Sequence, residues 1–417
     1  MRRALRGALI AASSAAVAAM AATSVLADGP PPAQPAVITD FRAGNVAQMA
    51  ERSALLARGE ALLSEGDTAA AMEQLDRAAM MLHAPDTEMA LVRAYLQAGD
   101  YRRALAFCAH TAGAHRETVA PSALYAWLLQ LGGQGAYAAR VLAEARTRAA
   151  DDPLLIAAAR ELASPAPRAD AVLLAGPQRM APYALVRGSD GPLPARAEVV
   201  ASGSVIDGGR HALVPLAALA QAQSIWLRNG LGETTSATLA QRIDDLGLAL
   251  LALTRPLDVG SAPQAAARDP FAGSPGFAIT YVATPDAAAA WPWLHAGFFG
   301  GLMRPDADSP ERRLGIAMPP GPRGGPVVDG AGRLAGVAVA SGNGEDGFVT
   351  ITALRQALGS AVGPAVGQAL GPAVAQASSD AAPAEAAAAP PLRAARMPND
   401  ELYERALRIA VQVIIAR

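Results

Sequence analysis

Small and apolar residues recur between positions 50 and 163 at spacings of 33 and then 34 residues. Three turns mark the spacing: Gly66-Asp67, Gly99-Asp100 and Gly133-Gln134. Each turn is followed at matching offsets by a small residue and then an apolar or small pair, namely Ala71, Leu75 and Ala78, then Ala104, Cys108 and Thr111, then Ala138, Leu142 and Ala145. Because a repeated helical unit buries its apolar face against its neighbours, this pattern predicts a stack of three helical hairpins.

This spacing resembles that of the tetratricopeptide repeat, in which two helices meet at a Gly-Asp turn. Pro85 and Pro153 fall where such repeats end, and Tyr95 fits the aromatic position of the first helix. The resemblance implies a concave surface for a peptide or a partner helix, unless the neighbouring domain or residues 28–40 cover the groove. The basic side chains of this region are scattered and are predicted to lie in solvent: Arg102, Arg103, His110, His115 and Arg116.

The N-terminus has the pattern of a secretory signal. Arg2 and Arg3 precede a long Ala-rich apolar stretch, and Val25-Leu26-Ala27 stands before Asp28 as a small-residue cleavage site. The alternative is an uncleaved anchor, because residues 7–26 are about long enough to span a bilayer. Alanine is only weakly apolar, so the pattern favours a signal peptide over residues 1–27 and export to the periplasm.

Residues 359–398 are rich in Ala, Pro, Gly and Ser, a composition that predicts a flexible linker. The last 19 residues break that pattern. Asn399-Asp400-Glu401 can cap a short helix whose apolar face is Leu402, Tyr403, Ala406 and Leu407, and Val411 to Ile415 predict a strand. An apolar strand is expected to dock on a sheet or on the repeats, in the same chain or in a neighbouring one.

A third pattern lies between residues 180 and 358. Gly321-Pro322-Arg323-Gly324-Gly325-Pro326-Val327-Val328 resembles the Gly-Asn-Ser-Gly-Gly-Pro-Leu-Val loop of trypsin-like serine proteases, particularly bacterial periplasmic ones. Arg323 stands in the place of the nucleophile. Upstream, Ala201 to Ala217 follows the family's Gly-Ser-Gly strand and its continuation, with Ala217 in the place of the base. Gly247-Leu248-Ala249-Leu250-Leu251 is similar to the family's Asp-Leu-Ala-Leu-Leu strand, with Gly247 in the place of the orienting Asp.

The resemblance implies a trypsin-like double β-barrel over residues 180–358. Acyl transfer in this family needs a hydroxyl, an imidazole and a carboxylate, and the residues at these three positions supply none of them. The backbone N–H groups of Gly321 and Arg323 would remain as an oxyanion-hole-like pair. The C-terminal helix and strand also resemble the opening of this domain, although a comparable strand exists at Tyr183 to Val186, so they could be the relic of a second, truncated domain.

Three interpretations of the degenerate site remain open. In one, Arg323 and the neighbouring N–H groups bind a peptide C-terminus or an acidic side chain. In another, Arg323 extends into a solvent-open cleft and binds nothing. In the third, His211 acts as a base with Asp244 or Asp245 as its carboxylate.

The amino-acid composition and the net charge limit the classes of partner that the chain is expected to bind. Hydrophobic residues make up 52% of the chain and charged residues 17%, which suits buried cores. A net charge of −2 without clustered basic residues argues against nucleic acid as a partner, and after signal cleavage no stable membrane insertion is expected.

Cys108 is the only cysteine, so it is predicted to fill a helical core. His, Cys and carboxylates show no ligand spacing, so no metal and no cofactor are expected.

Together these patterns predict a multi-domain α plus β chain: signal peptide 1–27, N-terminal segment 28–49, three repeats 50–163, linker 164–179, trypsin-like domain 180–358, linker 359–398 and helix-strand segment 399–417. The predicted function is that of an exported, catalytically inactive pseudoprotease, not an enzyme, that binds or scaffolds a protein or peptide in the periplasm. The alternative is a serine-type endopeptidase or other hydrolase that uses a non-standard constellation on the same fold.

Overall fold

The computed structural model describes residues 37–188, 191–260, 264–303, 311–319, 323–340, 346–361 and 396–417. The chain divides into two compact units, Met1–Ala47 and Gln48–Arg417. Helix α1 (Val37–Glu65) begins in the first unit, and the other described elements belong to the second. The predicted signal peptide and residues 362–395 of the predicted linker lie outside the described residues. Within the described ranges, no helix is long and apolar enough to cross a membrane.

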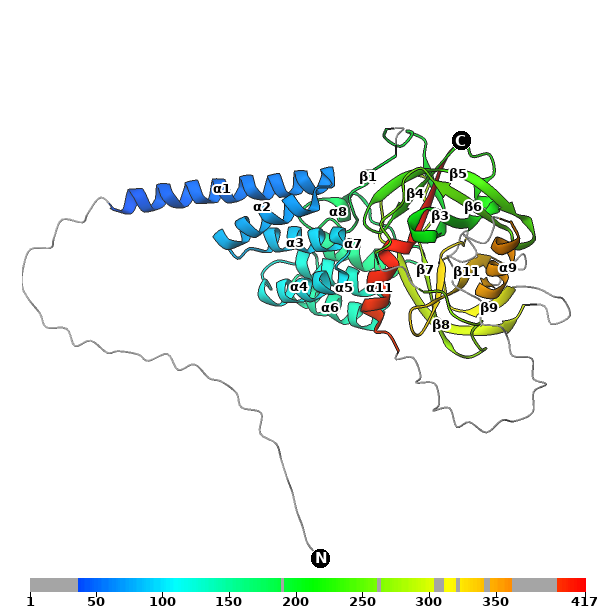
Figure 1. Ribbon diagram of the computed structural model, residues 1–417. Coiled ribbons are helices and arrows are strands. Elements are labelled where there is room, and N and C mark those ends of the chain that lie inside the picture. Colours follow the sequence, from blue (N-terminus) through cyan, green and yellow to red (C-terminus); the bar gives the residue numbers. More distant parts are fainter. Residues whose placement is uncertain are drawn as a thin grey trace, which may run out of the picture. The chain divides into compact units, whose positions relative to one another are not determined.

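Helices joined by short turns form the part of the second unit that precedes the strands (Figure 1). They are α2 (Thr68–Met81), α3 (Pro85–Ala98), α4 (Tyr101–Ala114), α5 (Ala120–Leu131), α6 (Gly135–Arg148), α7 (Pro153–Leu162) and α8 (Ala171–Leu174). Gly66, Gly99 and Gly133 have φ values of 89°, 86° and 75°, a region that glycine enters without steric cost. All nine positions that the repeat pattern selects are buried, including Cys108. The assignment of these hairpins to the tetratricopeptide family stays a prediction.

His115 corrects the expectation that the basic side chains of the repeats lie in solvent. It is buried, whereas Arg102, Arg103, His110 and Arg116 are exposed. His115 follows α4 as its C-cap residue, and its ring lies 4.7 Å from the ring of His83, centroid to centroid. The repeat spacing could not reveal this, because His83 lies in the turn between α2 and α3.

The first barrel is a closed ring of six strands. Its order is β5 (Glu233–Ile243), β4 (Ser224–Asn229), β13 (Ala410–Ala416), β2 (Glu198–Ile206), β3 (His211–Pro215) and β6 (Leu248–Leu253), and β6 pairs with β5 to close the ring. Three short 3₁₀ turns lie in the connections between its strands: η1 (Asp207–Gly209), η2 (Leu216–Leu219) and η3 (Asp244–Leu246). The two-residue strand β1 (Leu185–Val186) pairs in parallel with β5.

The second barrel is also closed and has six strands. Its order is β10 (Pro326–Asp329), β11 (Leu334–Ala340), β12 (Asp346–Thr350), β9 (Glu311–Gly315), β8 (Trp293–Leu302) and β7 (Pro275–Thr280). Helix α9 (Ile351–Ala361) follows β12 and places Leu354 and Leu358 in a core shared with β3 and β6. A helical N-terminal region followed by two six-stranded barrels confirms the predicted fold class, a trypsin-like double β-barrel.

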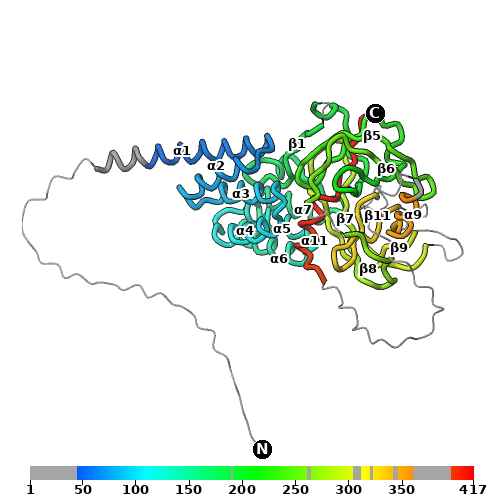
Figure 2. The backbone as a smooth tube through the Cα atoms, viewed as in Figure 1, coloured from blue at the N-terminus to red at the C-terminus, as the bar shows by residue number. Residues whose placement is uncertain are grey.

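The C-terminal strand β13 is an internal strand of the first barrel. It follows α11 (Asn399–Ile409) and runs between β2 and β4, so that Val411 pairs with Gly203 on one side and Asn229 on the other. Figure 2 shows the red C-terminal end of the tube among the green segments of that barrel. The predicted strand therefore docks in its own chain.

Three expectations about the C-terminal segment and the strand at Tyr183 to Val186 are corrected. The strand is not the relic of a second domain, because it supplies a strand that the first barrel needs to close. The strand predicted at Tyr183 to Val186 does not enter the ring: only Leu185 and Val186 form β1, which pairs with β5 alone. The expected cap by Asn399, Asp400 and Glu401 does not form, because α11 has Pro398 as its N-cap residue and no side-chain hydrogen bond caps it.

Helix α11 also joins the repeats to the barrels. Its Tyr403 ring meets the Tyr101 ring at the start of α4, with centroids 4.4 Å apart, and Tyr403 donates a hydrogen bond of 2.8 Å to the carbonyl of Pro292. Glu404 accepts hydrogen bonds from Arg102. Tyr101 and Tyr403 belong to one apolar core that includes side chains of the helices and of both barrels. The helical region and the barrels therefore bury their apolar surfaces against each other.

Candidate functional site

All three positions predicted from the protease resemblance line one cleft. Ala217, Gly247 and Arg323 contribute to a cavity with a volume of about 890 Å³. The cleft draws its walls from β2 and η2 of the first barrel, from residues 283–285, and from β11 of the second barrel. We call it the interbarrel cleft. The sequence resemblance thus located one place in the molecule, although the three positions lie up to 106 residues apart.

One hydrogen bond holds the segments of Ala217 and Gly247 together. The N–H of Leu216, next to Ala217, donates a hydrogen bond of 2.9 Å to the carbonyl of Gly247. Gly247 ends η3 with a φ of 62°, and no atom lies within 4 Å of the place where a Cβ would stand. The positions of the base and of its orienting carboxylate are therefore neighbours. Ala217 offers only a methyl group there, and Gly247 has no side chain.

Close packing of glycines fixes the backbone that follows Arg323. A Cβ on Gly324 would collide with the carbonyl oxygen of Ser202 and with Pro215, and a Cβ on Gly325 would collide with the carbonyl oxygen of Ile279. The Ser204 hydroxyl donates a hydrogen bond of 2.9 Å to the carbonyl of Gly324. The two glycines therefore let this segment approach both barrels, which positions Arg323 at the cleft.

The guanidinium of Arg323 is held by partners within the chain. Its Nε donates a hydrogen bond of 2.7 Å to Asp346 Oδ1, and its Nη1 donates one to the carbonyl of Pro319. The side chain is only 10% exposed. The interpretation in which Arg323 extends freely into solvent is therefore wrong, and a peptide carboxylate would have to compete with Asp346.

A hydroxyl and an imidazole meet close to Arg323. Thr280 Oγ1 and His295 Nε2 are 3.0 Å apart, on the adjacent strands β7 and β8. Burial, together with the positive charge of Arg323, lowers the pKa of His295 to about 4, while Asp346 opposes the shift. This imidazole is neutral at neutral pH. Sequence reasoning missed the pair because Thr280 and His295 lie outside the segments that resemble the protease motifs.

The structure does not support His211 as a base. Its Nδ1 lies 2.9 Å from Asp207 Oδ2, and its strand position pairs with Ala252. Asp244 is exposed and bonds to Arg242. His211 and Asp244 do not line the interbarrel cleft, and Gly321, half of the predicted oxyanion-hole-like pair, lies outside the described residues.

No protein-family model and no curated protein matches the chain. Solved structures resemble part of it. The MamO protease domain from Magnetospirillum magneticum is 18% identical, over 40% of this chain and 91% of that chain, with a TM-score of 0.29. Deg5 is 20% identical over 38% and 85% of the two chains, with a TM-score of 0.31. AlgW, an HtrA-type protease described with a decapeptide, is 20% identical over 38% and 50%, with a TM-score of 0.32. The assignment of a double barrel to this chain depends on its own strand pairing and not on these similarities.

One expectation is corrected by these comparisons. The sequence patterns predict that the chain is not an enzyme, whereas MamO and AlgW, which resemble it in structure, are named as proteases. The prediction of no enzymatic activity is therefore contradicted and is not carried further.

Proposed function

We propose that the chain is an exported module that binds a protein or peptide in the interbarrel cleft. The observation that carries the proposal is the convergence of Ala217, Gly247 and Arg323 on one cavity of about 890 Å³, within the range of roughly 300–1,000 Å³ that is usual for ligand sites. The walls are mainly apolar, with Val199, Leu246 and Val339 among them.

Charges around the cleft are paired within the chain, which favours an apolar segment as the ligand. Arg417 at the C-terminus lies 3.0 Å from Glu198, and Arg323 is paired with Asp346. An incoming carboxylate would have to displace one of these partners, whereas an apolar side chain would only displace water from the walls. The cleft therefore fits an unfolded or extended apolar stretch better than an acidic one.

Binding is tested with a fluorescein-labelled, unfolded casein and the full chain, measured by fluorescence anisotropy. Ala217→Trp fills the cleft, and Ala143→Trp places the same side chain on an exposed position of α6. We expect Ala217→Trp to weaken binding at least about tenfold, which corresponds to roughly 1.4 kcal/mol, and Ala143→Trp to leave it unchanged. Absence of binding, or equal binding by both variants, would refute the proposal. Gel analysis of the same mixtures records any cleavage separately.

Export is tested by cell fractionation and N-terminal sequencing of the secreted chain. We expect the mature protein to start at Asp28 and to be recovered from the periplasm. Recovery of the uncleaved chain in the membrane fraction would instead support the anchor.

A hydrolase is the second candidate, and the contact between Thr280 and His295 favours it. A threonine hydroxyl beside a neutral imidazole is the minimum arrangement for nucleophilic catalysis. Thr280 is only 3% exposed, and neither residue lines the interbarrel cleft, so substrate would need another route to them. If this pair hydrolyses peptide bonds, Thr280→Val and His295→Gln each abolish casein cleavage. Cleavage that persists in both variants excludes the pair.

A further inference from the structure

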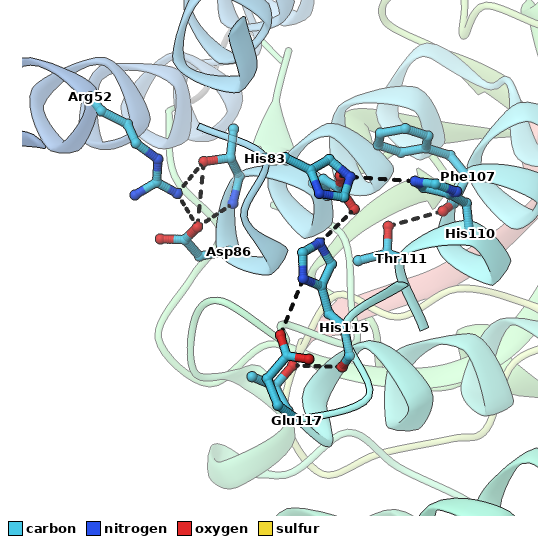
Figure 3. A network of polar contacts seen from close by, with 11 residues as sticks. Arg52, His83, Asp86, Phe107, His110, Thr111, His115 and Glu117 are labelled. Atoms are coloured by element: carbon cyan, nitrogen blue, oxygen red, sulfur yellow. Dashed lines mark hydrogen bonds and ion pairs between the residues drawn. The ribbon is translucent and has the colours of Figure 1, made fainter. Parts of the chain in front are cut away.

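Three of the five histidines in the chain gather in the helical repeats. His83 precedes α3, His110 lies in α4 and His115 follows α4, and Glu88 belongs to the first turn of α3. Figure 3 shows the rings of His83, His110 and His115 close together, with a dashed contact between His83 and His110. Ligand atoms of His83, Glu88 and His115 all lie within 4.8 Å of one another.

Two buried atoms of this cluster face each other without a hydrogen bond. His115 Nε2 and Glu88 Oε2 are 3.5 Å apart, and neither has a hydrogen-bond partner among the described residues. The side chains are only 9% and 4% exposed. Burial of unsatisfied polar atoms is costly, and a cation that accepts electron pairs from both atoms would remove that cost.

A carboxylate orients the ring of His115 for such a role. Glu117 Oε1 lies 3.2 Å from His115 Nδ1 (Figure 3), whereas Glu88 Oε2 lies 3.5 Å from the other ring nitrogen, Nε2. A proton on Nδ1 leaves the lone pair on Nε2, which points toward the cluster. Histidines that bind metals usually donate their second ring N–H to a carboxylate in this manner.

The spacing of the ligand atoms fits a small tetrahedral ion. Bonds of about 2.0–2.2 Å from Zn²⁺ to nitrogen and oxygen place neighbouring tetrahedral ligands roughly 3.3–3.6 Å apart. The distance of 3.5 Å between His115 Nε2 and Glu88 Oε2 is close to this value. His83 Nε2 and Glu88 Oε1 are 2.5 Å apart, as in a hydrogen bond, and would separate to admit an ion.

We propose that His83, Glu88 and His115 bind one divalent transition-metal ion, with water as the fourth ligand. Imidazole nitrogens with one carboxylate favour Zn²⁺ over the oxygen-preferring Mg²⁺ and Ca²⁺. The ion would tie the turn before α3 to the end of α4, and so fasten the open end of the α3–α4 hairpin. The sequence did not indicate this site, because Glu88 is 5 residues after His83 and 27 before His115, a spacing found in no short metal motif.

The test uses the full chain, stripped of metal with a chelator and titrated with Zn²⁺ in competition with a chromophoric chelator. The variants are His83→Gln, whose side chain is 58% exposed and so does not threaten folding, and Glu88→Gln. His211→Gln is the matched control, because His211 also contacts a carboxylate but lies in the first barrel. Circular dichroism verifies that each variant is folded.

We expect one Zn²⁺ per chain, at least about tenfold weaker binding for His83→Gln and Glu88→Gln, and no change for His211→Gln. Co²⁺ in place of Zn²⁺ should give the intense visible absorption of a tetrahedral site. Zn²⁺ should raise the melting temperature of the native chain more than that of His83→Gln. Failure to bind one equivalent, or equal affinity in the native chain and the His83 variant, would overturn the proposal and leave the cluster as an ion pair between His83 and Glu88.

Discussion

Replacing Ile414 by alanine tests whether the first barrel depends on a strand from the far end of the chain. Ile414 is fully buried in β13, where it packs with Ala197, Val199 and Trp226. It pairs with Val199 on β2 and Trp226 on β4. Removing its outer carbons leaves a cavity between two strands that do not otherwise pair with each other.

The expected cost follows from this burial. Changing a buried isoleucine to alanine destabilises a protein by about 2–5 kcal/mol, through lost transfer free energy and the cavity left behind. Ile156 on α7 is the matched control, because its side chain is 49% exposed. The same change there should alter the free energy of unfolding by less than about 0.5 kcal/mol.

Urea unfolding followed by tryptophan fluorescence measures both variants, because Trp226 packs directly against Ile414. We expect the midpoint of Ile414→Ala to fall well below that of the native chain and that of Ile156→Ala to stay unchanged. Equal midpoints for the two variants would mean that β13 does not contribute to the barrel core, and the strand order described above would be refuted.

Deleting residues 410–417 removes the whole strand. Val411, Val413, Ile414 and Ile415 are fully buried, and burial of each side chain contributes about 1.5–3 kcal/mol, or roughly 6–12 kcal/mol in total. That sum is comparable with the whole stability of a domain, which is about 5–15 kcal/mol. The truncated chain should therefore fail to form the first barrel, and a synthetic peptide of residues 396–417 should restore it in part. A truncated chain that unfolds at the native midpoint would contradict this.

Three further changes test the surroundings of Arg323. Gly325→Ala should lower the free energy of unfolding, measured in urea, by about 1–3 kcal/mol, because the new Cβ collides with a carbonyl oxygen of β7. Gly330 has open space around it, so Gly330→Ala is the control and should leave the free energy of unfolding unchanged. Equal effects of the two changes would contradict the close approach of Gly325 to β7. Arg323→Ser alone should not increase fluorophosphonate labelling over the native chain, because no imidazole stands at the base position. The pKa of His295 is about 4 in the folded chain and 6.5 in the unfolded chain. Between these pH values the imidazole is protonated in the unfolded chain but not in the folded one. The free energy of unfolding should therefore fall as the pH drops from about 6.5 to 4. His295→Gln should flatten that fall, and equal slopes in urea titrations of both proteins would refute the shift.

Much of the fold was predictable from local patterns. The helical hairpins follow from small residues and glycine turns within one period, and these positions are buried in the structure. The second barrel follows from motifs that occur in register along one stretch of the chain. The place of β13 could not be predicted, because period and composition identify a strand but not its neighbours, and consecutive strands usually pair with each other. Here β2 and β4 are separated by a strand that comes more than 180 residues later.

The candidate site was predictable in position but not in chemistry. The resemblance selected Ala217, Gly247 and Arg323, and they line one cleft. It could not show that Arg323 would be held by Asp346, which lies 23 residues further along the chain. The contact of Thr280 with His295 likewise arises from cross-strand neighbours on β7 and β8, which no motif marks.

The C-terminal segment links the helical repeats, the first barrel and the interbarrel cleft. Its helix contacts the repeats through Glu404 and Arg102, its strand completes the first barrel, and Arg417, its last residue, pairs with Glu198 at the interbarrel cleft. Every residue from Ala410 to Ala416 is buried, so this segment cannot shift without opening the barrel. Shifts of α11 on the repeats are therefore opposed by the barrel core as well as by the helix contacts. The cleft is consequently held in fixed register with the helical region by a strand that enters from the opposite end of the chain.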